Sequence, residues 1–208
     1  RKFSTIGLIC VPLQLKENGQ QNLRQSKTNK KFVYLISPNK IRDESFYTDL
    51  GHVLSSKKVS FFQLRLKKET NLKKLIIGKK IKKICKKYKV KFLINDDPIL
   101  AKKLNVDGCH LGQKDMDLMK AKKILKKKII GVTCHNSINL AKIAIKAGAD
   151  YLAFGAFYAS KTKIVKYRAS LTILRSIKKI TSLPIVAIGG IKLNNYKKLL
   201  LNKANFLA

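Results

Sequence analysis

The stretch KFLINDDPILAKKLNVDGCHLG (91–112) contains one complete strand–helix–strand repeat. Its first run, 91–96, is short and apolar, which is typical of a strand buried on both faces. Apolar residues at helical spacing follow over 97–104, and a second short apolar run covers 107–112. Two strands joined by a helix lie parallel in one sheet, because a right-handed crossover returns the chain to the edge where it started.

The same repeat recurs along the chain from residue 31 onward. Short apolar runs predict strands over 31–38, 59–66, 91–96, 107–112, 129–135, 150–156, 184–190 and 205–208. Helical patterns between them predict helices near 43–56, 70–89, 97–104, 116–127, 137–147, 168–180 and 194–202. Eight such units favour a closed barrel over an open sheet. The sequence therefore predicts an α/β fold, a (β/α)8 TIM barrel over 31–208 that is truncated after strand eight. Residues 1–30 are expected to form a flexible N-terminal extension.

The composition limits the class of protein. The 208 residues include 46 Lys or Arg but only 11 Asp or Glu, which gives a formal charge of +35. Only six of the basic residues are Arg, and the lysines lie on the polar faces of predicted helices. We therefore expect attraction of anionic small molecules and no specific nucleic-acid binding. No apolar run reaches the roughly 20 residues of a membrane span.

Four cysteines lie far apart and without metal-site spacing: Cys10, Cys85, Cys109 and Cys134. This pattern is typical of reduced thiols in a cytoplasmic protein. His135 follows Cys134, but adjacent strand residues point to opposite faces, so a thiolate–imidazole pair is not expected there.

Polar residues gather where the predicted strands end, the edge at which barrel enzymes carry their chemistry. Gln63, Arg65 and Lys67 alternate and so share one face of strand two. The later strand ends carry Asn95, Asp96 and Asp97; Gln113, Asp115 and Asp117; Thr133 and His135; Ser160, Lys161, Thr162 and Lys163; and Gly189 and Gly190.

Four of the scarce acidic residues lie at two neighbouring strand ends. Asp96 and Asp115 provide the one or two carboxylates typical of a Mg²⁺ site that phosphate oxygens and water complete. The alternative is chance clustering, or helix N-capping by Asp97 and Asp115. We prefer this alternative for Asp97 and Asp117, but not for Asp96. Arg65, in a chain whose usual cation is Lys, indicates a planar contact to a diphosphate, with an ion pair inside the barrel as the alternative.

Several motifs, in order, resemble those of the thiamine-phosphate synthase family: QLRLK (63–67), LINDD (93–97), DGCHLGQKD (107–115), IIGVTCH (129–135), GADYLAFGAFYASKTK (148–163) and PIVAIGGI (184–191). The resemblance covers about residues 31–208. It implies a TIM barrel that joins a hydroxymethylpyrimidine diphosphate to a thiazole phosphate, with Mg²⁺ and release of diphosphate. The partners it implies are these small molecules, with a homo-oligomer possible.

Carried over by position, the resemblance also implies roles for individual residues. The pyrimidine diphosphate would be bound by Gln63, Arg65, Lys67, Asn95, Thr133 and Lys163. The thiazole phosphate would be bound by Ser160, Lys161, Thr162 and Gly190. Asp96 and Asp115 would hold the metal, and Arg65, Lys163 and Thr133 would be catalytic.

Two other functions remain open from the sequence. A thiazole tautomerase of the same superfamily would use a histidine such as His135 to move a proton. A non-catalytic, basic barrel that binds polyanions would show salt-sensitive binding and no turnover.

Overall fold

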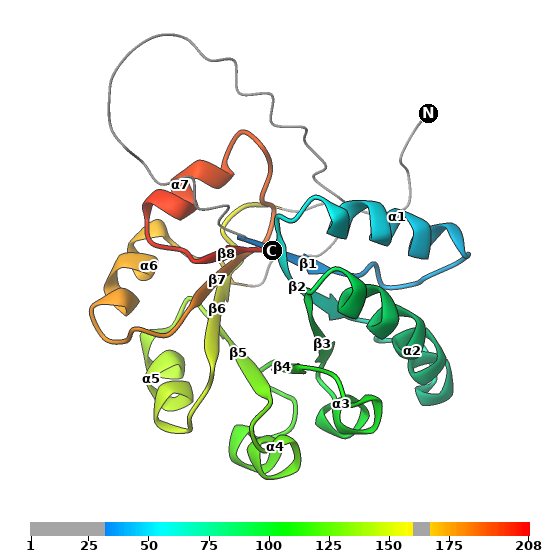
Figure 1. Cartoon of the computed structure of the whole chain (residues 1–208). Helices are drawn as coiled ribbons and strands as arrows, with labels where there is room; N and C mark the ends of the chain where they lie inside the picture. Colours follow the sequence, from blue (N-terminus) through cyan, green and yellow to red (C-terminus); the bar gives the residue numbers. More distant parts are fainter. Residues whose placement is uncertain (1–31, 160–166) are drawn as a thin grey trace, which may run out of the picture.

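Eight parallel strands close into a barrel in chain order, with helices packed around the outside (Figure 1). The computed structural model describes residues 32–159 and 167–208. The strands are β1 (Val33–Ile36), β2 (Val59–Leu64), β3 (Lys91–Asn95), β4 (Gly108–Leu111), β5 (Ile129–His135), β6 (Tyr151–Gly155), β7 (Ile185–Ile188) and β8 (Phe206–Leu207). The helices are α1 (Ser45–Ser55), α2 (Asn71–Lys87), α3 (Pro98–Leu104), α4 (Leu118–Leu125), α5 (Ile138–Lys146), α6 (Leu171–Lys178) and α7 (Tyr196–Leu201).

The predicted (β/α)8 barrel is confirmed, and β8 pairs with β1 to close it. Each predicted strand and helix is present; the strand over 129–135 has the predicted bounds, and the other elements are shortened by one or more residues. The expected N-terminal extension, 1–30, lies outside the described residues, as do Ser160, Lys161, Thr162 and Lys163.

The helices are amphipathic, as their lysine-rich sequences predict. In α2, Ile77, Ile81 and Cys85 recur every fourth residue and are buried. Their spacing places them on one face, while the lysines between them remain in water. The high positive charge therefore lies on the outer surface of the helical ring.

Polar side chains fix the start of several helices at the mouth of the barrel. Thr70 accepts a hydrogen bond from the Lys73 amide at the start of α2, and Ser137 accepts one from the Leu140 amide at the start of α5. Such caps satisfy amide groups that have no partner within the helix. They also fix each helix start directly after the strand end that carries the polar residues.

The barrel has a second, inner core that contains two tyrosines. Tyr34, Leu93, Tyr151, Ala153 and Val186 pack together inside the strands, apart from the larger core between strands and helices. Gly131 of β5 leaves room for one ring, because a Cβ there would lie 1.8 Å from Cζ of Tyr151. The interior is thus built around polar aromatic residues that require hydrogen-bond partners.

Within the described part of the chain, none of the helices is both long and apolar enough to cross a membrane.

Among the described residues, three cysteines are free and buried: Cys85, Cys109 and Cys134. Burial raises the pKa of both Cys85 and Cys134 to about 12 and raises that of Cys109 still further. Thiolate is the reactive form, so at neutral pH these groups are inert. Burial of Cys134 therefore also disfavours a role for this thiol as a nucleophile.

We predict that these three thiols in a Cys10→Ser variant react slowly with a disulfide reagent at pH 7.5, since each is protonated and shielded. All three should react at once after unfolding in guanidinium. Absorbance of the released chromophore measures the rate. A thiol that reacts within seconds in the folded protein would contradict the buried positions of Cys85, Cys109 and Cys134.

Candidate active site at the mouth of the barrel

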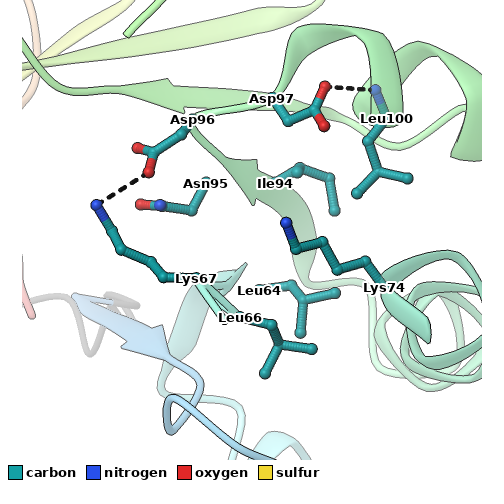
Figure 2. Close-up of a pocket in the computed structure, with 9 residues that line it drawn as sticks. All are labelled: Leu64, Leu66, Lys67, Lys74, Ile94, Asn95, Asp96, Asp97 and Leu100. Carbon is teal, nitrogen blue, oxygen red and sulfur yellow. Dashed lines mark hydrogen bonds and ion pairs between the residues drawn. The ribbon is translucent and has the colours of Figure 1, made fainter. Parts of the chain in front are cut away.

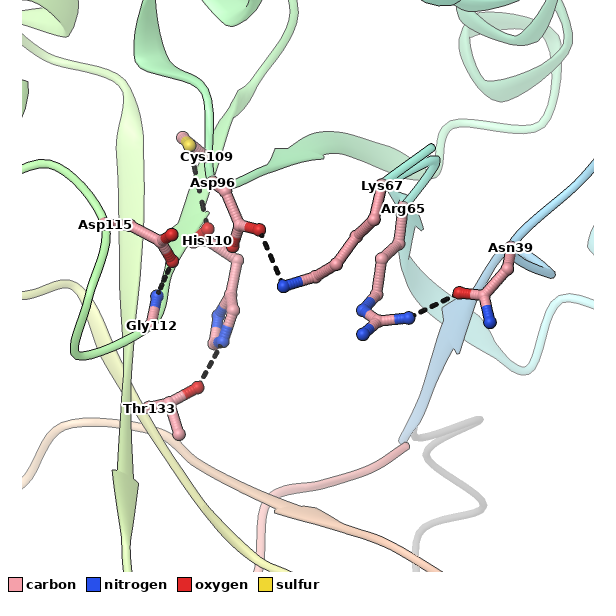
Figure 3. A network of polar contacts seen from close by, with 9 residues as sticks. All are labelled: Asn39, Arg65, Lys67, Asp96, Cys109, His110, Gly112, Asp115 and Thr133. Carbon is pink, nitrogen blue, oxygen red and sulfur yellow. Dashed lines mark hydrogen bonds and ion pairs between the residues drawn. The ribbon is translucent and has the colours of Figure 1, made fainter. Parts of the chain in front are cut away.

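The ends of β2, β3 and β4 bring charged side chains of both signs together (Figure 3). Lys67, in the segment after β2, places its Nζ 3.1 Å from Oδ2 of Asp96. Arg65 lies two residues earlier, and its Nη1 donates to Oδ1 of Asn39 at 2.6 Å. The structure therefore brings a lysine and an aspartate from the ends of neighbouring strands into contact.

Asp96 and Asp115 face each other across adjacent strand ends. The Asp96 amide donates to the carbonyl of His110 at 2.8 Å, which ties the end of β3 to β4. Asp115 accepts a hydrogen bond from the Gly112 amide at 2.6 Å. Burial raises the pKa of Asp115, and its hydrogen bond with Asp96 and the negative charge of Asp96 raise it further. Two carboxyl groups thus share one small space.

The same pair fits a hard divalent cation. Two carboxylates held close together repel each other, and a cation between them removes that repulsion. Over residues 32–159 and 167–208, no group of three or more His, Cys, Asp and Glu residues could hold a metal. Two carboxylates without further protein ligands suit Mg²⁺, which usually keeps water and takes substrate phosphate oxygens. They do not suit a structural zinc site.

Asp97 and Asp117 have a structural role, as predicted. Asp97 accepts a hydrogen bond from the Leu100 amide at 2.8 Å, and Asp117 accepts one from the Lys120 amide at 3.1 Å. Each residue is the N-cap of the helix that follows it, α3 or α4. The capping interpretation is confirmed for Asp97 and extends to Asp117, whereas Asp115, for which capping was also considered, is not the N-cap of α4.

Two cavities flank the charged site. The first, of about 170 Å³, is shown in Figure 2 and is lined by Leu64, Leu66, Lys67, Lys74, Ile94, Asn95, Asp96, Asp97 and Leu100. Its floor is apolar, and Lys67, Asn95 and Asp96 lie at its polar side. The second, of about 500 Å³, is lined by Gln113, His135, Asn136, Ser137, Leu140, Tyr167 and Arg168.

The remaining predicted residues lie at different depths. Gln63 is buried, and its Nε2 donates to the Tyr34 hydroxyl at 2.8 Å, below the charged site. Thr133 of β5 is half-buried and pairs with His110 at 2.8 Å. Arg65 has an amide partner, Asn39, and is in none of the ion pairs found among the described residues. Among the described residues, nothing therefore supports the alternative that Arg65 forms an ion pair inside the barrel.

Gly190 lies in the loop after β7, where it contacts the segment after β6. Its φ is +64°, and a Cβ there would lie 2.4 Å from the carbonyl oxygen of Ala159. A residue other than glycine would therefore be strained and would also displace a backbone carbonyl. Glycine is needed at this position because the backbones of two neighbouring loops pack closely against each other.

Three polar residues of the barrel interior were not predicted as part of the site: Tyr34, His110 and Tyr151. Each lies on a predicted strand, and each is buried with a polar partner. The available signal was a polar or aromatic side chain at alternating positions of an otherwise apolar strand. The alternation does not show which other strands carry the hydrogen-bond partners of these three residues.

The fold and the site together define a (β/α)8-barrel enzyme whose charged site lies at the carboxyl ends of the strands. The model of the thiamine monophosphate synthase family matches residues 33–208, and the chain belongs to this family. It is a transferase with thiamine-phosphate synthase function.

Individual relatives support this assignment to the family. The chain is 86% identical to a thiamine-phosphate synthase of Pelagibacter ubique (strain HTCC1062), over 89% of this chain and 90% of the relative. It is 40% identical to that of Nitrosomonas eutropha (strain DSM 101675 / C91 / Nm57), over 81% and 79%. Among solved structures, thiamine phosphate pyrophosphorylase from Pyrococcus furiosus is 29% identical, with a TM-score of 0.75 and coverage of 86% and 85%. These matches favour the synthase over the tautomerase and the polyanion-binding barrel.

We predict that Gly190→Ala destabilises the protein by about 1–3 kcal/mol, because alanine is strained at this φ and its Cβ meets a backbone carbonyl. Gly51→Ala is the matched control: it lies in α1, and its Cβ would make ordinary contact with Tyr88 at 3.7 Å. Guanidinium unfolding followed by circular dichroism measures both variants. Equal stability of the two variants would show that the Gly190 loop does not require glycine.

Proposed function

We propose that the chain joins a hydroxymethylpyrimidine diphosphate to a thiazole phosphate and releases diphosphate, with Mg²⁺ held by Asp96 and Asp115. Membership of the family supports the overall reaction. The observation that supports the metal site is the facing pair of carboxylates, with the Lys67 ammonium 3.1 Å from Asp96. Cations and carboxylates at one barrel mouth are suited to a diphosphate bound together with a metal ion.

The site residues divide into two groups. For the pyrimidine diphosphate we propose Gln63, Arg65, Lys67, Asn95, Thr133 and Lys163. For the thiazole phosphate we propose Ser160, Lys161, Thr162 and Gly190. Residues 160–163 lie outside the described residues, so their roles are supported by the family resemblance alone.

The reaction begins with the bond between the pyrimidine methylene carbon and the diphosphate oxygen. That bond breaks, and its electron pair leaves with the diphosphate, so the methylene carbon becomes a cation stabilised by the electron-rich ring. The lone pair of the thiazole nitrogen then forms the new carbon–nitrogen bond. No proton has to be removed for this step, and the site accordingly needs no general base.

The residues of this chain act on the charge that develops in that step. The Arg65 guanidinium and the Lys67 ammonium lie beside the carboxylate pair, where they stabilise the departing diphosphate. Mg²⁺ held by Asp96 and Asp115 would supply further positive charge to the departing diphosphate. Leu64, Ile94 and Leu100 form an apolar cavity floor that offers water no side-chain hydrogen bond on that side of the site.

Two further expectations belong with this proposal. The free thiols of Cys85, Cys109 and Cys134 support a cytoplasmic location. The substrates are small molecules, and a homo-oligomer stays a prediction.

We predict that Asp96→Asn lowers kcat at least about 100-fold, since it removes one metal carboxylate. Asparagine tolerates the positive φ of this position, +66°, so the backbone should be preserved. Asp96→Ala should abolish turnover. Diphosphate release from the two mixed substrates, with and without Mg²⁺, measures the effect.

Asp117→Asn is the control for Asp96→Asn. It removes the same charge from the neighbouring β4–α4 loop, but asparagine still caps α4, so activity should be retained. Unchanged Mg²⁺-dependent activity in Asp96→Asn would refute the metal assignment. Absence of diphosphate release by the unaltered protein would refute the proposed substrates.

We predict that Gly112→Ala raises the Mg²⁺ concentration required for half-maximal rate several-fold. A Cβ at this position would lie 2.8 Å from Oδ2 of Asp115, the same oxygen that the Gly112 amide holds. The methyl group must displace the carboxylate from its present position. Gly51→Ala, far from the site, should leave the Mg²⁺ requirement unchanged, and an equal requirement in Gly112→Ala would count against Asp115 as a ligand.

A further inference from the structure

Five polar side chains form one hydrogen-bonded series through the barrel interior, which we call the interior network: Gln63, Tyr34, Tyr151, His110 and Thr133. Gln63 Nε2 donates to the Tyr34 hydroxyl, and the Tyr34 and Tyr151 hydroxyls pair, each at 2.8 Å. Nδ1 of His110 pairs with the Tyr151 hydroxyl, and Nε2 pairs with Oγ1 of Thr133, again at 2.8 Å. Figure 3 shows the His110–Thr133 end beside the carboxylate site.

Only one direction of donation gives every hydrogen of the network an acceptor within it. The amide nitrogen of Gln63 can only donate, so it occupies one lone pair of the Tyr34 oxygen. If Tyr34 also accepted from Tyr151, its own buried hydrogen would have no acceptor in the network, so Tyr34 donates to Tyr151 and Tyr151 donates to Nδ1 of His110. A neutral imidazole that accepts at Nδ1 carries its hydrogen at Nε2 and donates it to Thr133.

The burial of the network supports a neutral histidine. His110 is 8% exposed, and Tyr34 and Tyr151 are each 3% exposed. An imidazolium would have to donate from both nitrogens, so a ring that accepts from Tyr151 at Nδ1 is neutral. Burial also raises the pKa of both tyrosines, so both hydroxyls keep their hydrogens.

We propose that the interior network holds His110 as its Nε2–H tautomer, so that the Thr133 hydroxyl hydrogen is free to be donated to an acceptor on the substrate, a ring nitrogen of the pyrimidine. This inference rests on the proposed function for the identity of the substrate. Thr133 is the group that contacts the ring. His110 and Tyr151 are positioning residues, because they act on the ring only through Thr133.

This direction suits the proposed reaction. The pyrimidine must become cationic when the diphosphate leaves, and a charged imidazolium nearby would oppose that change. A neutral network instead orients the ring through a neutral hydroxyl and adds no positive charge. If donation ran the opposite way, Thr133 would donate to His110 and could only accept from the substrate, which would select a donor group on the ring.

Nitrogen NMR of the full chain with ¹⁵N-labelled histidine tests the tautomer without reference to activity. The protein has three histidines, and loss of one set of signals in His110→Gln assigns His110. We expect a protonated, pyrrole-like Nε2 and an unprotonated, pyridine-like Nδ1. Tyr151→Phe removes the donor to Nδ1 and should shift the signals toward a mixture of tautomers. A protonated Nδ1, or an imidazolium, at His110 of the unaltered protein overturns the inference.

Steady-state kinetics test the consequence for the substrate. Thr133→Ser keeps the hydroxyl and should retain the KM of the unaltered protein, whereas Thr133→Val should raise KM for the pyrimidine diphosphate about tenfold. Tyr151→Phe should raise the same KM by a smaller factor and leave KM for the thiazole phosphate unchanged. The inference is overturned if Thr133→Ser and Thr133→Val have the same KM. It is also overturned if Tyr151→Phe changes the KM values of both substrates equally. Absence of turnover in the unaltered protein would refute the proposed function, and the NMR result would still decide the tautomer.

Discussion

The repulsion between the Asp96 and Asp115 carboxyl groups is the interaction on which the site depends. In a chain of 208 residues with a formal charge of +35, two of the 11 acidic residues are held together, although separation would relieve their repulsion. Hydrogen bonds from the Gly112 amide and to the His110 carbonyl keep this pair in place. Such an arrangement is stable when a cation neutralises it, and Lys67 provides part of that charge.

The barrel makes this arrangement possible because parallel strands end at the same edge. Asn95 and His110 are paired in the β3–β4 register, so the residues that follow them lie side by side. The same register places the His110 side chain inside the barrel and its carbonyl against Asp96. One residue therefore contacts both the carboxylate site and the interior network, and connects the barrel's inner core to its charged mouth.

The sequence predicted the fold and part of the site for physical reasons. Each strand–helix unit is local, so periodicity shows it, and the closed barrel follows from repetition. Asp97 and Asp117 were recognisable as caps because a cap bonds within three residues along the chain. The interior network was missed because its bonds join distant residues: Tyr34 and Tyr151 are 117 positions apart. No local pattern encodes that contact, which depends on register and on the space left by Gly131.

The most direct test of the central claim is the position of a bound metal. Crystals of the protein with Mn²⁺ and inorganic diphosphate, measured at a wavelength where manganese scatters anomalously, would show the ion directly. The account predicts an anomalous peak at bonding distance, about 2 Å, from a carboxylate oxygen of both Asp96 and Asp115. A fully occupied peak that contacts neither aspartate would contradict it.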